Sequence, residues 1–272
     1  MREYAQRLKN GGALFLLPEP TYPTLRIPDL SAPDSSQEYD IGTAYMFNGK
    51  AYYYAYTSAA ANSRQGACTA YKQEVSQQLL GADAAIYAES ITLTVAATDG
   101  IAANGAIAKD YLKGGSVVVF PSGSGGSSYD FTRGIVSNAA VATSGGTMVV
   151  ELDGGIPYAL TAATSVAEAG ASPWRAILNS TAAWMPKVGV PTCYAAAGKY
   201  VWVQTWGLCW VAPQTGIGTA GYHHAIFKHD GSVEKITTVD LNHSDQYAGW
   251  SSSWGAAGAQ AAPFIFLMIA CP

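Results

Sequence analysis

The chain has 272 residues and a formal net charge of −4. Charged residues make up 12% of it, about half of the roughly 25% usual in soluble proteins. No basic run exceeds two residues, so the clustered Lys and Arg that would neutralise nucleic-acid phosphates are missing. A chain of this length can bury a large core. We therefore expect a surface that is small and neutral or that faces other protein chains, and no nucleic-acid partner.

Residues 1–40 are expected to form an extended, proline-containing N-terminal arm. Prolines fix φ and disfavour helix in the residues before them. Apolar side chains lie between the prolines, and an arm so apolar should rest on a surface, either its own domain or a neighbouring chain. The candidate interaction residues of the arm are Leu14, Phe15, Leu16, Leu17, Tyr22, Leu25 and Ile27.

Neither end of the chain predicts secretion or membrane insertion. The apolar run ALFLL at 13–17 is short for the core of a signal peptide. The run FIFLMIA at 264–270 is far below the roughly eighteen residues that span a bilayer. We expect no membrane partner and synthesis in the cytoplasm.

Residues 41–272 are expected to form one β-rich domain, with 245–272 as a candidate C-terminal extension. Asn48-Gly49 separates two β-prone runs and predicts a hairpin. The spacing of Val75 and Leu79 before Gly81 predicts one short helix over 70–80. Alternation of apolar and polar residues then predicts a strand that ends in the turn Asp99-Gly100.

The rest of the chain predicts further short strands. Two strands flank the glycine-serine loop 122–128, two more lie within 188–213, and two flank the turn Asp230-Gly231. A last apolar strand covers 264–270. Many short strands with little helix indicate an all-β fold, a barrel or sandwich of short antiparallel strands that carries the extended N-terminal arm.

The segment KYVWVQTWGLCWVAP, residues 199–213, is the most unusual stretch of the chain. In a strand, Trp202, Trp206 and Trp210 point to the same face, together with Gln204 and Leu208. Such a row fits a core or a contact between subunits, because both faces of the strand are apolar. It could also stack on sugar rings, together with the tyrosines of AYYYAYT at 51–57.

No pattern predicts catalysis. His223, His224, His229 and Asp230 form the only histidine cluster, and the sequence places no partners around it. The cysteines Cys68, Cys193, Cys209 and Cys271 are far apart without C-x-x-C spacing, so a zinc site is not indicated and their disulfide status stays open. We expect neither an enzyme nor a bound metal or cofactor.

Three segments carry a resemblance to a known group of proteins: AANGAIAKDYLKGGSVVVF with YDFTRGIVSN, then MVVELDGGIPYAL with SPWRAIL, then VGVPTCYAAAGKYVWVQTWGLCWV. Their order is similar to that in virion structural proteins of tailed bacteriophages, which resemble head decoration, or cement, proteins. The resemblance covers roughly residues 40–235. It implies a β-domain on the outer capsid, bound to the major capsid protein and to copies of itself as a homo-oligomer, with a trimer favoured. The long arm and the C-terminal strand depart from small decoration domains.

The sequence therefore predicts a phage virion protein that stabilises the capsid surface through repeated protein–protein contacts. The alternative is a carbohydrate-binding β-module, lectin-like or part of a tail or adsorption apparatus, that uses exposed Trp and Tyr. A minor head or tail component is a further position that the resemblance leaves open.

Overall fold

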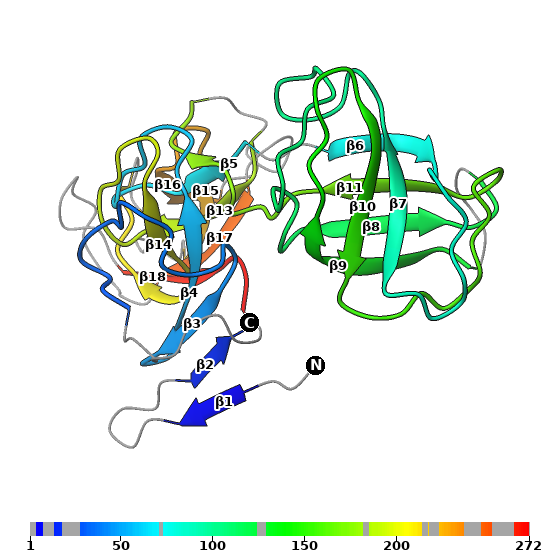
Figure 1. Cartoon of the computed structure of the whole chain (residues 1–272). Helices are drawn as coiled ribbons and strands as arrows, with labels where there is room; N and C mark the ends of the chain where they lie inside the picture. Colours follow the sequence, from blue (N-terminus) through cyan, green and yellow to red (C-terminus); the bar gives the residue numbers. More distant parts are fainter. Residues whose placement is uncertain are drawn as a thin grey trace. The chain divides into compact units, whose positions relative to one another are not determined.

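The computed structural model describes residues 28–70, 73–123, 129–181, 185–213, 217, 223–236, 246–251 and 264–271, and the backbone of 4–7 and 14–17 (Figure 1). Every regular element in these ranges is a β-strand, which confirms the all-β class. No helix in the described part of the chain could cross a membrane. Residues 41–272, expected as one domain, divide between two compact units: unit 2 is Tyr71–Ser172, and unit 1 is Met1–Ala70 with Pro173–Pro272.

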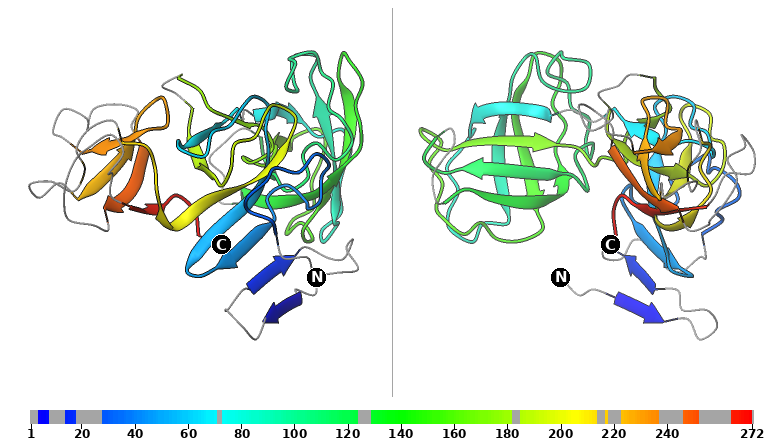
Figure 2. Two further views of the ribbon diagram at one scale, coloured as in Figure 1. Left: turned by 90° about the vertical axis from the view of Figure 1, so that its left-hand side faces the viewer. Right: turned by 180° about the vertical axis from the view of Figure 1, so that it is seen from behind.

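Unit 2 is a curled six-stranded antiparallel sheet (Figures 1 and 2). Its strand order is β6-β11-β8-β9-β10-β7. The two outer strands meet where Leu80 bridges Leu93 and the amide of Gly81 donates a hydrogen bond to the carbonyl of Thr92, at 2.8 Å. The strands are β6 (Gln73–Leu79), β7 (Ser90–Val95), β8 (Ser116–Phe120), β9 (Phe131–Asn138), β10 (Gly146–Leu152) and β11 (Val166–Gly170).

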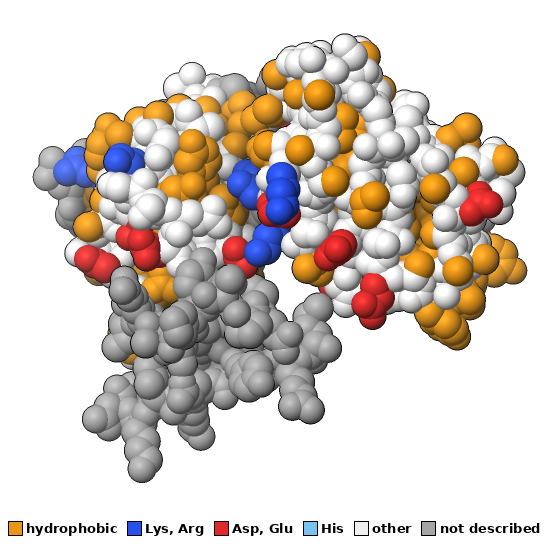
Figure 3. All heavy atoms as spheres, viewed as in Figure 1, with side chains coloured by type: hydrophobic (Ala, Val, Ile, Leu, Met, Phe, Trp, Pro, Cys, Tyr) orange, Lys and Arg blue, Asp and Glu red, His pale blue; other side chains and the backbone are white. Residues whose placement is uncertain are grey.

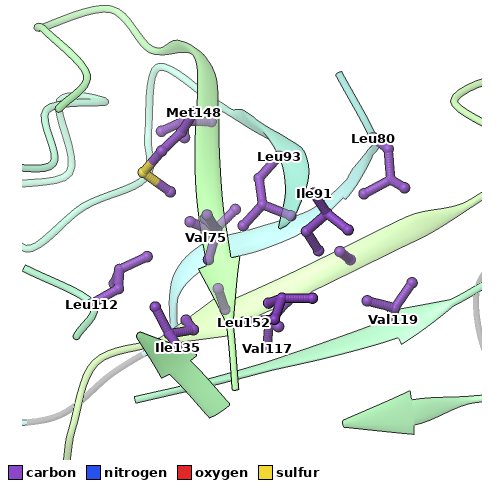
Figure 4. Packing of buried hydrophobic residues seen from close by; sticks show 14 of the residues in the cluster. Val75, Leu80, Ile91, Leu93, Leu112, Val117, Val119, Ile135, Met148 and Leu152 are labelled. Atoms are coloured by element: carbon purple, nitrogen blue, oxygen red, sulfur yellow. The ribbon is translucent and has the colours of Figure 1, made fainter. Parts of the chain in front are cut away.

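The core of unit 2 lies inside this curled sheet. Alternate residues of β7 and β10 are buried, as a strand with one face on a core requires. Figure 4 shows side chains from several strands converging on one another, among them Val75, Leu93, Val117 and Met148. The turn Asp99-Gly100 predicted after β7 is present, and Gly100 has a φ of +78°.

The helix predicted over 70–80 is wrong. Residues Gln73–Leu79 form strand β6, which pairs with β11. The prediction required Val75 and Leu79 on one apolar face, but Val75 is buried and Leu79 is 49% exposed. Pairing with a distant strand overrides the local helical spacing in this segment.

The described residues of unit 1 form twelve strands in one branched sheet. The main order is β1-β2-β3-β4-β14-β18-β17-β15-β16, and β13, β5 and β12 branch from β14. The strands are β1 (Tyr4–Arg7), β2 (Leu14–Leu17), β3 (Ala44–Phe47), β4 (Lys50–Tyr56), β5 (Ala67–Thr69), β12 (Ile177–Leu178), β13 (Lys187–Pro191), β14 (Tyr200–Cys209), β15 (His224–Phe227), β16 (Val233–Lys235), β17 (Gln246–Ser251) and β18 (Ile265–Met268).

The predicted hairpin at Asn48-Gly49 is confirmed. It joins β3 to β4, and both turn residues have positive φ, 49° and 72°. The long strand β14 passes close to this turn, where a Cβ on Gly207 would lie 2.5 Å from the carbonyl oxygen of Gly49. Gly207 also has a φ of +86°, so a larger residue is excluded on both grounds.

The last strands of unit 1 form a half-barrel around their own core. In Figure 2, β15 to β17 in orange and β18 in red lie beside the yellow end of β14. The sheet curls until Val233 of β16 bridges Pro213, just after β14. The enclosed core includes Val211, Ala225, Phe227, Ile265 and Leu267.

Residues 28–40 of the N-terminal arm rest on the body of unit 1. Asp34 and Tyr200 exchange two backbone hydrogen bonds of 2.8 and 3.0 Å. Leu30 and Tyr39 pack against the buried Tyr54 and its neighbours. Residues 28–40 are therefore an intramolecular strap. The backbone of 14–17 forms β2 and pairs with β3. The side chains of Leu14, Phe15, Leu16 and Leu17, and the residues Tyr22, Leu25 and Ile27, lie outside the described residues.

Candidate interaction surface

Trp202 belongs to a buried aromatic core and not to a binding surface. It is 2% exposed, and its ring lies 5.0 Å from that of Tyr54 and 5.2 Å from that of Tyr39. Tyr52 and Tyr54 of the AYYYAYT run are buried beside it. Tyr53, which lies between them in the sequence, stacks on Trp174 with 3.9 Å between ring centroids. These tyrosines therefore offer no continuous platform for a sugar ring.

Burial also changes the acidity of this core. It raises the pKa of Tyr52 to about 12, with smaller contributions from Cys209 and Tyr45. The pKa of Tyr54 is raised as well, first by burial and then by its hydrogen bond to Asp34. The phenols therefore stay protonated in ordinary buffers.

The second half of β14 differs from the first. The pairing with β4 shifts register between Gln204 and Trp206, which marks a bulge. Gln204 is buried, whereas Trp206 is partly buried and Leu208 is 38% exposed. Trp210, beyond the strand, is also partly buried. The tryptophan row that strict alternation predicts is thus divided: Trp202 lies in a core, and Trp206 lies at the surface.

Exposed apolar side chains continue from Leu208 across the half-barrel. Leu208 pairs with Phe266, Phe266 with Trp250, and Trp250 with His224, so one row crosses β14, β18, β17 and β15. Paired residues point to the same face of a sheet. We call the surface formed by these side chains and their neighbours the aromatic face; it comprises Trp206, Leu208, Tyr247, Trp250, Phe266 and Met268.

The rings of the aromatic face pack against one another. Trp250 and Phe266 are stacked, with 5.1 Å between centroids and 8° between planes. Trp206 meets Phe266 edge-on, at 5.5 Å and 83°. Trp250 is nevertheless 40% exposed and Met268 39%. The inner side of the same strands supplies the half-barrel core, so the fold is filled without the aromatic face.

A polar contact lies at the β15–β17 border of this surface. Nδ1 of His224 lies 3.0 Å from the hydroxyl oxygen of Tyr247. Figure 3 shows one face of the molecule, where charged side chains occupy small patches among neutral and hydrophobic ones. A surface with few charged side chains has a small desolvation penalty when another protein covers it.

The histidine cluster is not assembled into a site. His224 contacts Tyr247, and the backbone carbonyl of His229 accepts a hydrogen bond from Lys187. Burial raises the pKa of Asp230, but hydrogen bonds from the hydroxyl and amide of Ser232, together with smaller charge effects of His229 and Lys187, lower the pKa overall. Among the residues that the structure describes, no three His, Cys, Asp or Glu side chains gather as a metal site.

All four cysteines are free thiols. Cys68 and Cys209 are buried, Cys193 is partly buried and Cys271 is exposed. Burial raises the pKa of Cys209 to about 12. None of the four forms a disulfide with another, and they are far apart in the sequence as well.

Sequence reasoning missed most of the aromatic face. Of its six residues, only Trp206 was among the interaction candidates; Leu208 was placed on the same strand face. Phe266 could have been found from the alternation in FIFLM, where Phe266 and Met268 fall on one side and Ile265 and Leu267 on the other. The sequence around Trp250 has no comparable alternation that would place it on this face. Its neighbour across the sheet depends on strand order.

Comparison with known proteins leaves the family of the chain open. No protein-family model, no curated protein and no solved structure matches it. Its function therefore has to be argued from the surface that the fold presents.

Proposed function

We propose that this chain is a structural protein of a bacteriophage particle that binds the outside of the capsid through protein–protein contacts. The observation that carries the proposal is the aromatic face, where exposed Leu208 and Trp250 and the partly buried Phe266 between them form a row across three strands, β14, β18 and β17. Large aromatic side chains dominate the energy of protein interfaces. The major capsid protein and further copies of this chain are the proposed partners.

The packing of the rings favours a protein partner over a carbohydrate. A sugar ring binds against the open flat face of an aromatic ring. Trp250 and Phe266 lie nearly parallel and stack on each other, so each has one flat face occupied. Rings packed in this way present edges and gaps, into which side chains of a protein can interdigitate.

The composition supports the same proposal. A capsid-binding protein covers much of its surface with neighbours and needs few charges to stay soluble once assembled. This chain has 15 Lys and Arg and 19 Asp and Glu among 272 residues. The resemblance of residues 40–235 to head decoration proteins gives the capsid as the partner, and the all-β fold agrees with it.

The first test is size fractionation of the native source material, with the chain followed by mass spectrometry. We expect it to migrate with particles of megadalton size, in a fixed ratio to one abundant shell protein. Elution as a free species of tens of kilodaltons would contradict the proposal. Glycan arrays would then test the carbohydrate alternative.

The second test compares surface variants for binding to particles that lack the protein. The double variant Trp250→Ala, Phe266→Ala should fold and lose most of its occupancy, because both rings leave the proposed contact. Tyr194→Ala is the matched control: Tyr194 is an aromatic residue of unit 1, 63% exposed and outside the aromatic face. If both variants bind the particles to the same extent, the aromatic face is not part of the interface.

A further inference from the structure

A lysine and a cysteine face each other in the interior of unit 1. Cys68 of β5 and Lys187 of β13 are direct partners in the antiparallel pairing of these strands. The Nζ atom of Lys187 lies 2.8 Å from the Sγ atom of Cys68. Cys68 is fully buried and Lys187 is 4% exposed.

This separation is short for nitrogen and sulfur. It falls within the range of an N–H···O hydrogen bond, about 2.7–3.2 Å, although sulfur is a larger atom than oxygen. The other partner of Nζ is the carbonyl oxygen of His229, also at 2.8 Å. Sγ has one more contact, with the carbonyl oxygen of Ser180 at 4.0 Å. The two reactive atoms are therefore aimed at each other.

Among the described residues, no carboxylate forms an ion pair with Lys187. Lys228, by contrast, forms an ion pair with Glu234. An ammonium group without a counter-ion is costly to bury. A thiol is a weak hydrogen-bond partner for it. The site thus holds an amine and a thiol in contact. The nearby carboxylate of Asp230 has its pKa lowered in part by the charge of Lys187, but the hydrogen-bond partners of Nζ are Sγ of Cys68 and the carbonyl oxygen of His229.

We propose that Cys68 and Lys187 form a covalent nitrogen–oxygen–sulfur cross-link when hydrogen peroxide oxidises the pair. The amine of Lys187 and the thiol of Cys68 react with two molecules of hydrogen peroxide. The products are the cross-link Lys–NH–O–S–Cys and three molecules of water. One N–H bond, the S–H bond and both O–O bonds break, and an N–O and an O–S bond form. Nitrogen and sulfur together give up four electrons, which the two peroxides accept. The thiol enters through its sulfenic acid, the first step of cysteine oxidation.

The position of this cross-link gives it a structural consequence. Cys68 lies just before unit 2 in the sequence, and Lys187 lies after it. The bond would close one covalent loop that contains all of Tyr71–Ser172. A cross-link that closes a long loop restricts the unfolded chain and so stabilises the fold. Oxidation would thereby lock β5, the last strand of unit 1 before unit 2, to β13, the second strand after it.

The other buried thiol is the matched control. Cys209 is 9% exposed, and its Sγ lies 3.5 Å from the carbonyl oxygen of Trp210. Lys187 contacts Cys68 and not Cys209. If burial alone controlled oxidation, Cys68 and Cys209 would behave alike. If the lysine matters, only Cys68 forms a cross-link.

The test uses the full-length chain carrying Cys193→Ser, because Cys193 lies in the tryptic peptide next to Lys187. After treatment with hydrogen peroxide, we expect an intact mass higher by one oxygen and lower by two hydrogens. Trypsin should leave the bond after Lys187 uncleaved and join residues 65–72 to 176–199. A thiol reductant should restore both the mass and the cleavage. Cys68→Ser and Lys187→Met should abolish the joined peptide, and Cys209→Ser should retain it.

Thermal unfolding gives a second readout. The oxidised protein should unfold at a midpoint higher by roughly 5–10 °C than the reduced protein, as a stabilising cross-link predicts. Lys187→Met should remove that difference. Recovery of folded, oxidised protein in which Cys68 is a free thiol, or a sulfinic or sulfonic acid, and Lys187 is cleaved normally by trypsin would overturn the proposal.

Discussion

Asp34 accepts a hydrogen bond from the phenol of Tyr54, with 2.6 Å between the oxygens. Tyr54 is fully buried, and its ring packs on Trp202. A residue of the N-terminal arm thus completes the polar contacts of a core tyrosine that comes twenty residues later. The arm from residue 28 onward is therefore part of the folded unit 1.

The first prediction concerns this hydrogen bond. Asp34→Ala leaves the buried phenol of Tyr54 without its carboxylate acceptor, and we expect unit 1 to lose about 1–3 kcal/mol of stability. Urea denaturation measures the change. Asp29→Ala is the control in the same segment, because the carboxylate of Asp29 is exposed and accepts only from Ser31. Equal stability of the two variants would contradict the role of Asp34.

The second prediction separates the two kinds of tryptophan. Trp202→Ala removes a buried ring from the aromatic core, and we expect a loss of about 3–5 kcal/mol. Trp250→Ala removes a ring that is 40% exposed, and we expect a loss of about 1 kcal/mol or less. Chemical denaturation of both variants tests the difference. A large loss for Trp250→Ala would make the aromatic face part of the core.

The third prediction is a loss of stability at alkaline pH. The pKa of Tyr52 is about 12 in the folded protein and about 10 in an unfolded chain. Between these values the unfolded state binds fewer protons than the folded state, so the free energy of unfolding falls as pH rises. The stabilisation is complete below pH about 10, and about 2–3 kcal/mol is lost as pH rises through about 12.

Denaturation curves at a series of pH values measure this slope, with Tyr52→Phe as the control. The variant should show a shallower decline, because Phe does not ionise. Some decline should remain, since burial also raises the pKa values of Tyr54 and Cys209. The same slope in both proteins would show that Tyr52 does not contribute.

Local patterns predicted much of the fold because turns and alternation are local properties. Asn48-Gly49 and Asp230-Gly231 each lie between two strands that pair, as predicted. The helix over 70–80 failed because the partner of β6 is β11, about ninety residues away. The division into two units was also missed. The chain from Tyr71 to Ser172 has the same strand-and-turn character as the segments around it, and only contacts reveal the insertion.

The candidate site was less predictable than the fold. Trp202 and Trp206 lie four residues apart on one strand, where alternation predicts the same face, yet a bulge after Gln204 and different neighbouring strands give them different environments. The pairing of Phe266 with Trp250 depends on strand order, which the sequence does not encode locally. The contact of Lys187 with Cys68 joins residues 119 positions apart.

The last prediction is that residues 71–172 fold alone. Their core is filled by their own strands, and the curled sheet closes at Leu80 and Leu93. Gln73 at the start of β6 pairs with Gly170 at the end of β11. The two ends of the excised fragment therefore lie close together. We expect the excised unit to be monomeric by gel filtration and to unfold cooperatively on heating. An expressed fragment without a cooperative transition would show that unit 2 depends on the rest of the chain, although its strands pair only with one another.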